Sequence, residues 1–419
     1  MSATFGWHPA ARLFDAAGNE VASPGRGAGT AARAVFPDSA AGLAAAIGHP
    51  AFRIGAPDQP PPAPHEEPVL ETLTSGSMGR PRRIRRTQRS WIASFAVTAG
   101  LGIGPGARVA TLGHLIHSLS LYGAVEGLHL GAEVHLLAEL RPDRQRRALR
   151  DRRITHLYAT PAQLRLILGP GQLPDLRLVL VGGAKLDPAL RAVLAALAPE
   201  AAIREFYGAA ETSFVTLADA TTPAGSVGRP YPGVELRLDP GGEIWVRSPY
   251  LCLGPAFQPC PDVPAGRTSG PVARAEARPE ASAPALLANP HGTRWRDGWL
   301  SVGEIGEMRA GHLYLKGRAG RMVTVADQNV FPEEIETFLL GLAGIARAAV
   351  LPVPDARRGQ SLVAVLQGDP GQEAAILRAL RAELGPLKAP KAVIWRQDWP
   401  VLASGKTDLN ALEADLWPG

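Results

Sequence analysis

The chain has 419 residues, which is enough for two or three folding units that each bury an apolar core. Hydrophobic residues make up 46% of it and charged residues 20%, and these values exclude collagen-like and wholly disordered classes. The formal net charge of +5 fits an enzyme that handles polyanions. It fits equally a chain whose codons favour arginine, so charge alone selects no function.

The first stretch, up to about residue 64, is rich in alanine, glycine and proline and predicts a piece of modest regularity. Within it we expect a helical patch at 40–47 and a proline-rich linker at 60–64. The chain shows neither a signal-peptide pattern nor an apolar run of about eighteen residues, so we expect neither export nor a membrane span. Cys252 and Cys260 have no other metal-ligating residues at suitable spacing, and two cysteines cannot form a disulfide framework for a chain of this length. A reducing cytoplasm is therefore expected.

From residue 69 onward, short apolar runs are followed by helical segments, as at 156–168 and 176–198. This alternation predicts an α/β fold with mainly parallel, helix-covered sheets. Residues 225–254 instead show short alternating runs with glycine and proline turns, which predict a small antiparallel β subdomain. Residues 255–290 have little periodicity and are interpreted as a surface insertion. From about residue 317, strand-like and helical segments predict a compact α+β module.

A segment of small hydroxyl residues and glycines follows the apolar run that begins at residue 69. Such residues let backbone N–H groups approach phosphate oxygens closely, and a guanidinium adds charge-assisted hydrogen bonds. No Lys-Ser or Lys-Thr pair follows the last glycine, so this is not the common nucleotide-binding P-loop. A surface turn is the alternative interpretation. The candidate phosphate-binding residues are Thr74, Ser75, Gly76, Ser77, Gly79 and Arg82.

This segment resembles the signature phosphate loop of the adenylate-forming superfamily, which includes acyl-CoA synthetases, luciferases and adenylation domains. Residues 206–211 resemble the family's YGxTE segment, and residues 297–304 resemble its GWxxTGD segment. Residues 317–336 are similar to the motif that opens the mobile C-terminal domain, and residues 404–406 to the final SGK motif. Five ordered matches across about four-fifths of the chain identify it as a member with a short N-terminal region.

The resemblance implies a large domain at 1–316 and a mobile C-terminal lid domain at 317–419. In the site, Lys406 would reach the substrate carboxylate and the α-phosphate, and Glu211 would hold magnesium. Glu304 would accept hydrogen bonds from the ribose hydroxyls, with Arg318 beside it. His117 would border the acyl pocket, although a buried structural histidine is the alternative. Further nucleotide-binding residues by resemblance are Gly183, Ala184, Phe206, Tyr207, Gly208 and Ala209, of which Tyr207 could instead be a core aromatic.

The implied activity is ATP- and Mg²⁺-dependent conversion of a carboxylic acid to an acyl-adenylate, followed by acyl transfer to the thiol of coenzyme A. A carrier-protein phosphopantetheine is the alternative acceptor, and a non-catalytic nucleotide- or acyl-binding descendant is the alternative of another class. The apolar segment at 115–127 favours a fatty or aromatic acid. Arginine-rich runs at 80–89 and 141–153 lack interleaved aromatics, so no nucleic-acid partner is expected, and the second run is interpreted as a solvated helix face.

Several residues depart from the family's usual motifs. Met78 and Ala210 each remove a hydroxyl, at a typical cost of about 0.5–1.5 kcal/mol per hydrogen bond. Arg82 and Glu304 stand where lysine and aspartate are usual, and each keeps the charge. Asp327 stands where a glycine usually lines the pantetheine tunnel and would narrow it. Gly320 occupies the expected hinge position, where its backbone freedom permits rotation of the lid.

Overall fold

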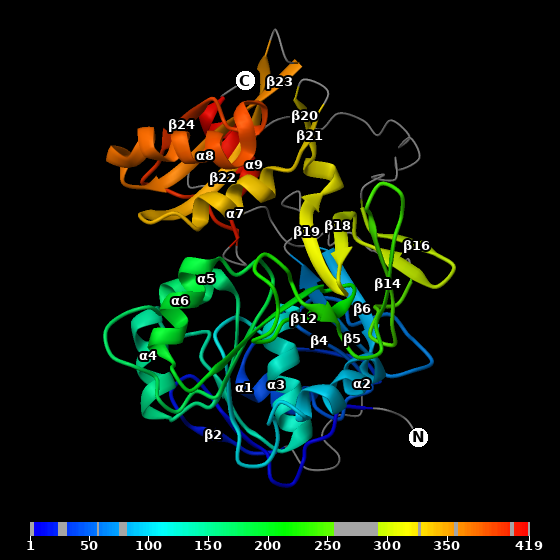
Figure 1. The fold of residues 1–419 in the computed structure, drawn as a ribbon. Coiled ribbons are helices and arrows are strands. Elements are labelled where there is room, and N and C mark those ends of the chain that lie inside the picture. Colours follow the sequence, from blue (N-terminus) through cyan, green and yellow to red (C-terminus); the bar gives the residue numbers. More distant parts are fainter. Residues whose placement is uncertain are drawn as a thin grey trace, which may run out of the picture.

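The computed structural model describes residues 4–23, 32–56, 58–74, 82–254, 292–325, 328–355, 359–402 and 406–417 (Figure 1). Its largest sheet has nine strands, and the six from β11 to β1 run parallel, as the alternating sequence pattern predicted. The strands in sheet order are β13 (Arg229–Pro230), β12 (Ser213–Leu217), β11 (Ala202–Ala209), β10 (Leu178–Val181), β9 (His156–Ala159), β7 (Arg108–Thr111), β8 (Glu133–Leu136), β1 (Arg12–Phe14) and β2 (Glu20–Val21).

Helices cover both faces of this sheet because successive strand residues point to opposite faces. Leu178 and Leu180 of β10 pack into one core cluster with α2 (Gln88–Ala99) and α3 (Ser118–Leu130). Val179 and Val181 pack into a second cluster on the other face. The helices there are α4 (Pro142–Asp151), α5 (Pro161–Leu166) and α6 (Pro188–Leu197). A near-continuous apolar strand is therefore buried between two helical layers.

The N-terminal region is more regular than its composition predicted. Besides β1 and β2, it supplies two strands of a second sheet, which has the order β3-β4-β5-β6. These strands are β3 (Ala34–Phe36), β4 (Ala51–Ile54), β5 (Val69–Thr74) and β6 (Arg82–Thr87). The expected helical patch is confirmed as α1 (Ala40–Ala46). A strand of two or three residues has almost no recognisable sequence pattern of its own, so pairing with neighbouring strands determines whether it forms.

The antiparallel subdomain predicted around 225–254 is present as a four-stranded sheet. Its order is β14 (Glu235–Leu238), β15 (Ile244–Arg247), β17 (Trp299–Ser301) and β16 (Arg294–Arg296). A hairpin of β18 (Glu304–Arg309) and β19 (His312–Arg318) follows. The interpretation of 255–290 as an insertion falls outside the described residues. The arginine-rich run at 141–153 largely forms α4, whose Arg144, Arg147 and Arg150 are exposed, as expected.

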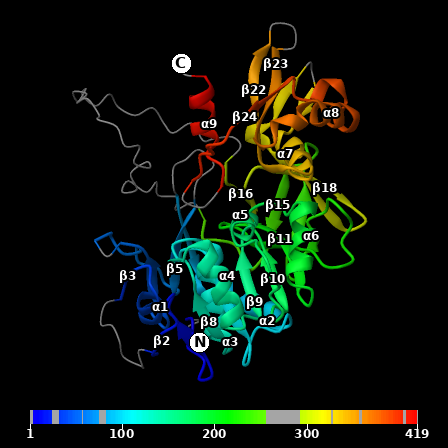
Figure 2. The ribbon, with the colours of Figure 1, turned by 90° about the vertical axis from the view of Figure 1, so that its left-hand side faces the viewer.

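The C-terminal part forms an α+β module with its own apolar core, as the sequence predicted. Its elements are the 3-10 turn at Ala319–Arg321, β20 (Val323–Val325), β21 (Gln328–Val330), α7 (Pro332–Leu340), β22 (Ile345–Asp355), β23 (Gly359–Gly368), a 3-10 turn at Pro370–Gln372, α8 (Glu373–Lys388), β24 (Ala392–Trp395) and α9 (Leu409–Leu416). Both ribbon views place this module at one end of the larger domain (Figures 1 and 2). The predicted boundary after residue 316 lies within β19 and stays a prediction.

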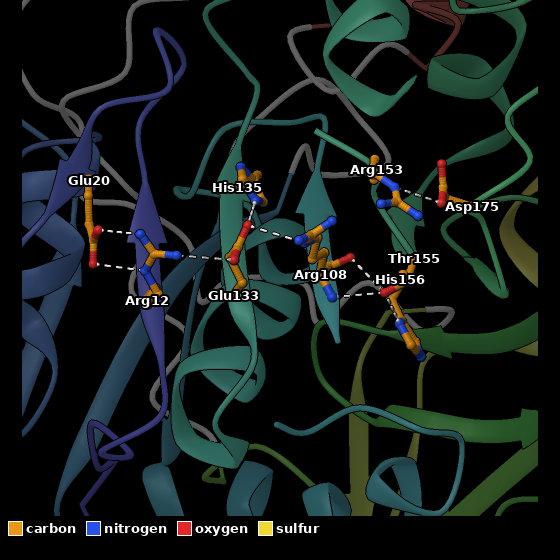
Figure 3. Close-up of polar contacts among 9 residues, drawn as sticks. All are labelled: Arg12, Glu20, Arg108, Glu133, His135, Arg153, Thr155, His156 and Asp175. Atoms are coloured by element: carbon orange, nitrogen blue, oxygen red, sulfur yellow. Dashed lines mark hydrogen bonds and ion pairs between the residues drawn. The ribbon is translucent and has the colours of Figure 1, made fainter. Parts of the chain in front are cut away.

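Ion pairs join neighbouring strands of the large sheet at their amino ends (Figure 3). The Glu133 carboxylate lies 2.9 Å from His135 Nε2, 3.5 Å from Arg108 Nε and 3.6 Å from an Arg12 guanidinium nitrogen. Arg12 also contacts Glu20 of β2 at 2.6 Å. Because residues 12, 108 and 133 are paired across β1, β8 and β7, these contacts hold the strand register at this edge. No helix within the described ranges is long and apolar enough to cross a membrane.

Candidate functional site

The strand β5 ends at Thr74, where the predicted phosphate loop begins. Thr74 Oγ1 donates to the carbonyl oxygen of Arg82 at 3.5 Å, so the two ends of the loop lie together. Leu73 N donates to the carbonyl of Ile116 at 2.9 Å, and His117 Nδ1 lies 3.5 Å from the Leu73 carbonyl. The segment that carries His117 is thus tied to the base of the loop. The candidates Ser75, Gly76, Ser77 and Gly79, together with Met78, lie outside the described residues.

Glu211 follows β11 in the short turn before β12, and its side chain is buried. Its Oε1 lies 3.4 Å from Arg82 Nη2 and 3.5 Å from the Thr293 hydroxyl, so its polar contacts are long. Across the part of the chain that the structure describes, no group of three or more His, Cys, Asp or Glu could hold a metal. Mg²⁺ is commonly bound by one or two carboxylates with water and phosphate oxygens, so Glu211 fits a single-ligand role.

Arg86 is a residue of this site that sequence reasoning missed. It is fully buried, donates to the carbonyl oxygens of Ala210 and of Tyr250, the latter at 3.0 Å, and lies 5.3 Å from the Trp91 ring. Burial lowers the pKa of its guanidinium to about 10, while Cys252 and Glu211 raise it. Arg86 therefore holds the peptide that precedes Glu211. Nothing in the sequence of the arginine-rich run at 80–89 distinguishes this buried arginine from Arg82, Arg83 and Arg85, which are half-buried, or from the exposed Arg89.

Glu304 and Arg318 stand opposite one another in the β18–β19 hairpin. Arg318 Nε lies 3.4 Å from Glu304 Oε1, whereas Glu304 Oε2 is buried and has no hydrogen-bond partner in the structure. Desolvation lowers the pKa of Arg318, but Glu304 and Glu333 outweigh it and the pKa is raised. A buried acceptor without a donor is costly, so the Glu304 carboxylate is suited to receive a hydroxyl from a ligand.

Phe206 and Tyr207 lie on β11 with different surroundings. The Tyr207 side chain is buried in the main core, and its pKa is raised by burial and by the nearby Glu304 carboxylate. The Phe206 ring packs on the turn after β10, where a Cβ on Gly182 would come 2.1 Å from the ring. Gly183 in the same turn has φ +85°, a left-handed conformation that favours glycine. Ala184, Gly208 and Ala209 complete the predicted nucleotide set beside these residues.

Lys406 opens the last described range, 406–417, and its carbonyl accepts a hydrogen bond from Leu402 N at 2.8 Å. The Lys406 residue is solvent-exposed. Desolvation by the surrounding protein lowers the pKa of its ammonium, and the charge of Arg318 lowers it further, whereas the carboxylates of Glu304 and Glu211 raise it. Lys406 in turn contributes to the lowered pKa of His117, whose main cause is burial. The structure therefore brings together five predicted site residues from distant segments: His117, Glu211, Glu304, Arg318 and Lys406.

Solved structures of known proteins share the fold. An amide bond synthetase from Marinactinospora thermotolerans superposes with a TM-score of 0.68 at 23% identity, covering 91% of this chain and 79% of that protein. ATP-bound MatB from Rhodopseudomonas palustris has a TM-score of 0.67 at 23% identity, covering 90% and 72%. At these identities the likeness shows the fold alone, and it confirms the predicted α/β class.

Sequence relatives are closer. An uncharacterized acyl–CoA ligase of Bacillus subtilis, YhfT, is 32% identical over 368 residues, which cover 84% of this chain and 69% of that protein. The fatty acid–[acyl-carrier-protein] ligase ScoC of Streptomyces coeruleorubidus is 28% identical, covering 85% and 70%. The indoleacetate–CoA ligase of Aromatoleum aromaticum is 28% identical, covering 81% and 66%. The chain thus spans about two thirds of the length of these relatives.

The comparison with family profiles agrees with the motif order. The profile of the AMP-binding enzyme family matches residues 16–254, and the profile of its C-terminal domain matches residues 334–406. The first match alone covers more than half of the chain. The predicted resemblance is confirmed, and this chain belongs to the AMP-binding enzyme family.

Proposed function

We propose that this chain is an AMP-forming acid–thiol ligase, which activates a carboxylic acid with ATP and Mg²⁺ and transfers the acyl group to coenzyme A. The observation that supports the proposal is the electrostatic influence of Arg318, Glu304 and Glu211 on the pKa of Lys406, which comes from the C-terminal module. Two relatives named as CoA ligases support the same activity.

The first half-reaction brings a carboxylate oxygen to the α-phosphorus of ATP, and both groups are anionic. Positive charge between them stabilises the transition state most when it is already oriented and partly shielded from water. Lys406 supplies this charge, and the nearby Glu304 and Glu211 carboxylates favour its protonated form. Mg²⁺ at Glu211 would supply further charge to the phosphates. Pyrophosphate leaves, and the acyl group remains as the adenylate.

The orientation of ATP would come from Glu304 and Arg318. The partnerless Glu304 Oε2 accepts a ribose hydroxyl, and Arg318 lies beside the same carboxylate through its Nε. Burial lowers the pKa of His117, and the charge of Lys406 acts in the same direction, so a neutral imidazole is favoured near neutral pH. A neutral His117 borders the acid without adding a charge that repels Lys406.

The test is acid-dependent pyrophosphate release for the wild type and Lys406→Ala, with a panel of fatty and aromatic acids, with and without coenzyme A. Loss of the lysine should reduce release at least about a hundredfold, since removing one preorganised transition-state contact typically costs that much. Lys391→Ala is the matched control, because Lys391 belongs to the same module and makes only a partly exposed ion pair with Asp355.

Release that depends on the acid and on Lys406, followed by a CoA thioester, would establish the proposal. If Lys406→Ala released pyrophosphate as fast as wild type, the proposal would be wrong. No release with any acid would instead favour the non-catalytic descendant. Adenylate formation without a CoA thioester would favour a carrier protein as acceptor, for which the similarity to ScoC is the supporting observation. The cytoplasmic location and the effect of Asp327 remain predictions.

A further inference from the structure

One face of the four-stranded antiparallel sheet presents arginines interleaved with tryptophans. Strand pairing places Arg237 opposite Trp245, and Arg296 opposite Trp299. Alternation along each strand then puts Arg247 and Arg294 on the same face. The opposite face carries Leu236, Leu238, Ile244, Val246 and Leu300, which pack inward. We call the outward residues the Arg–Trp face: Arg237, Trp245, Arg247, Arg294, Arg296 and Trp299.

The guanidinium groups of this face stack on the two indole rings. Arg237 lies 4.8 Å from the Trp299 ring centre and 5.9 Å from that of Trp245, and Arg247 lies 4.6 Å from the Trp299 ring. Arg294 and Arg296 lie 5.6 and 5.8 Å from the Trp245 ring. Contact with the rings restrains the arginine side chains. Less rotamer entropy is then lost when the N–H groups bind carboxylates.

Carboxylates of the described residues form ion pairs with two of the four arginines on this face. Arg247 pairs with Glu235 through Nε at 3.1 Å, and Arg294 pairs with the buried Glu243. Arg237 and Arg296 are both exposed, and neither forms an ion pair with a carboxylate of the described residues. Two exposed guanidinium groups that contact indole rings are therefore available on this face, which is a suitable arrangement for an acidic protein partner.

We propose that the Arg–Trp face docks an acidic carrier protein, whose phosphopantetheine thiol accepts the acyl group. This rests on the adenylation step of the proposed function, and it adds a protein-bound thiol as a second acceptor besides coenzyme A. Glu304 follows Trp299 by five positions, so the Cα atoms of the two residues lie at most ~17 Å apart. Figure 1 shows β14 and β16 next to the β18–β19 hairpin that carries Glu304 and Arg318.

The same geometry argues against a single-stranded nucleic acid as the partner. Such partners bind by stacking bases on open aromatic rings. Trp245 is only 6% exposed and is flanked by three arginines, and Trp299 carries Arg237 and Arg247 on its ring. The indoles therefore orient cations and offer no free stacking surface.

The experiment compares wild type with the double variant Arg237→Glu/Arg296→Glu. The acceptors are the holo acyl carrier protein of a dissociated fatty acid synthase and free coenzyme A, with the best acid from the panel. The matched control is Arg144→Glu/Arg147→Glu, which makes the same charge change on the exposed face of α4. A second variant, Arg237→Lys/Arg296→Lys, keeps the charge but loses the planar donors.

We expect the double glutamate variant to lower kcat/KM for carrier acylation at least about tenfold through KM, and to flatten its dependence on salt. Pyrophosphate release and CoA thioester formation should stay within about twofold of wild type, and the lysine variant should lie between. The α4 control should match wild type with both acceptors.

Three results would overturn the docking surface. One is a wild-type enzyme that forms the CoA thioester but never acylates the carrier. Another is an unchanged carrier KM in the double glutamate variant, and the third is an equal loss with both acceptors, which marks a structural role. If the wild type releases no pyrophosphate with any acid, the proposed function fails. Direct titration of holo carrier protein onto wild type and variant then still decides whether the face binds it.

Discussion

Glu126 is a fully buried carboxylate on α3. Its two oxygens accept hydrogen bonds from the Thr98 and Tyr158 hydroxyls, and Tyr122 lies nearby. Burial raises the pKa of this carboxyl to about 7 from its ordinary value of 4.5, although the three hydroxyls lower it. A buried carboxylate of this kind couples the protonation state of the core to folding.

The stability of the protein should therefore depend on pH through Glu126. The folded state holds the Glu126 proton more tightly than the unfolded state does. The contribution of this proton to the free energy of unfolding is therefore fully present below pH 4.5 and is lost as the pH rises to about 7. The total loss is on the order of 3 kcal/mol, at 1.36 kcal/mol per pKa unit. We expect Glu126→Gln to flatten this fall in the free energy of unfolding.

The measurement is denaturant unfolding of wild type and Glu126→Gln at pH 5 and pH 8. The difference between the two proteins isolates Glu126 from the other titrating groups. Equal pH dependence of wild type and variant would show that the carboxyl is ionised throughout. Glu133→Gln is a useful control, because Glu133 also lies in the large domain but forms its contacts at the partly exposed sheet edge.

At the scale of elements, the turn after β10 and the strand β11 form one unit. Gly182 lets the Phe206 ring lie directly on the backbone, and Gly208 leaves room for the carbonyl oxygen of Ser213, which a Cβ would approach to 1.9 Å. Phe206 also contacts Phe214 of β12, with ring centres 4.5 Å apart. The predicted nucleotide-binding residues at 182–184 and 206–209 are thus positioned by mutual packing, so a change in one displaces the other.

Gly182→Ala should move Phe206, because the new methyl group would stand about 2 Å from ring atoms. Overpacking of this kind typically costs ~1–3 kcal/mol, and we expect the KM for ATP to rise about tenfold. The double variant Gly182→Ala/Phe206→Leu should recover part of the loss, since a smaller side chain makes room. Gly104→Ala is the control, because its Cβ would meet no atom closer than 3.7 Å. A normal KM in Gly182→Ala would contradict this account, which steady-state kinetics can check.

At the scale of the whole molecule, the larger domain and the C-terminal module meet at Gly320. Ala319 N donates to the Gly303 carbonyl at 2.9 Å, which ties residue 319 to the larger domain. Arg321 pairs with Glu336 of α7 at 2.7 Å and with Glu333 at 3.3 Å, which ties residue 321 to the module. Gly320 stands between these two anchors. This agrees with its predicted hinge role, which stays a proposal.

Gly320→Pro should separate the two half-reactions. Proline fixes φ near −65° and so restricts the rotation that acyl transfer requires. We expect thioester formation to fall about tenfold or more while acid-dependent pyrophosphate release is largely retained. Gly320→Ala should have a much smaller effect, because alanine keeps most backbone freedom. Single-turnover assays of each step distinguish these outcomes, and an equal loss in both would contradict a hinge.

Sequence patterns predicted the local features of the fold. The α1 patch, the strand–helix pairs at 156–168 and 176–198 and the antiparallel sheet depend on neighbouring residues, so periodicity revealed them. The short strands β1 to β4 depend on partners farther along the chain, and composition alone underestimated them. Motif order points to His117, Glu211, Glu304, Arg318 and Lys406 as site residues, and their roles stay predictions.

The sequence by itself determined family membership and the α/β class, since both rest on ordered motifs and on the period of apolar residues. Only the tertiary structure decided which charged residues are buried and which are presented together. Arg86 finds its partners at positions 210 and 250, and Glu126 finds Tyr158 across the core. The Arg–Trp face combines β14 and β15 with β16 and β17, which follow more than 40 residues later. Desolvation and stacking depend on such distant neighbours, and a linear pattern does not contain them.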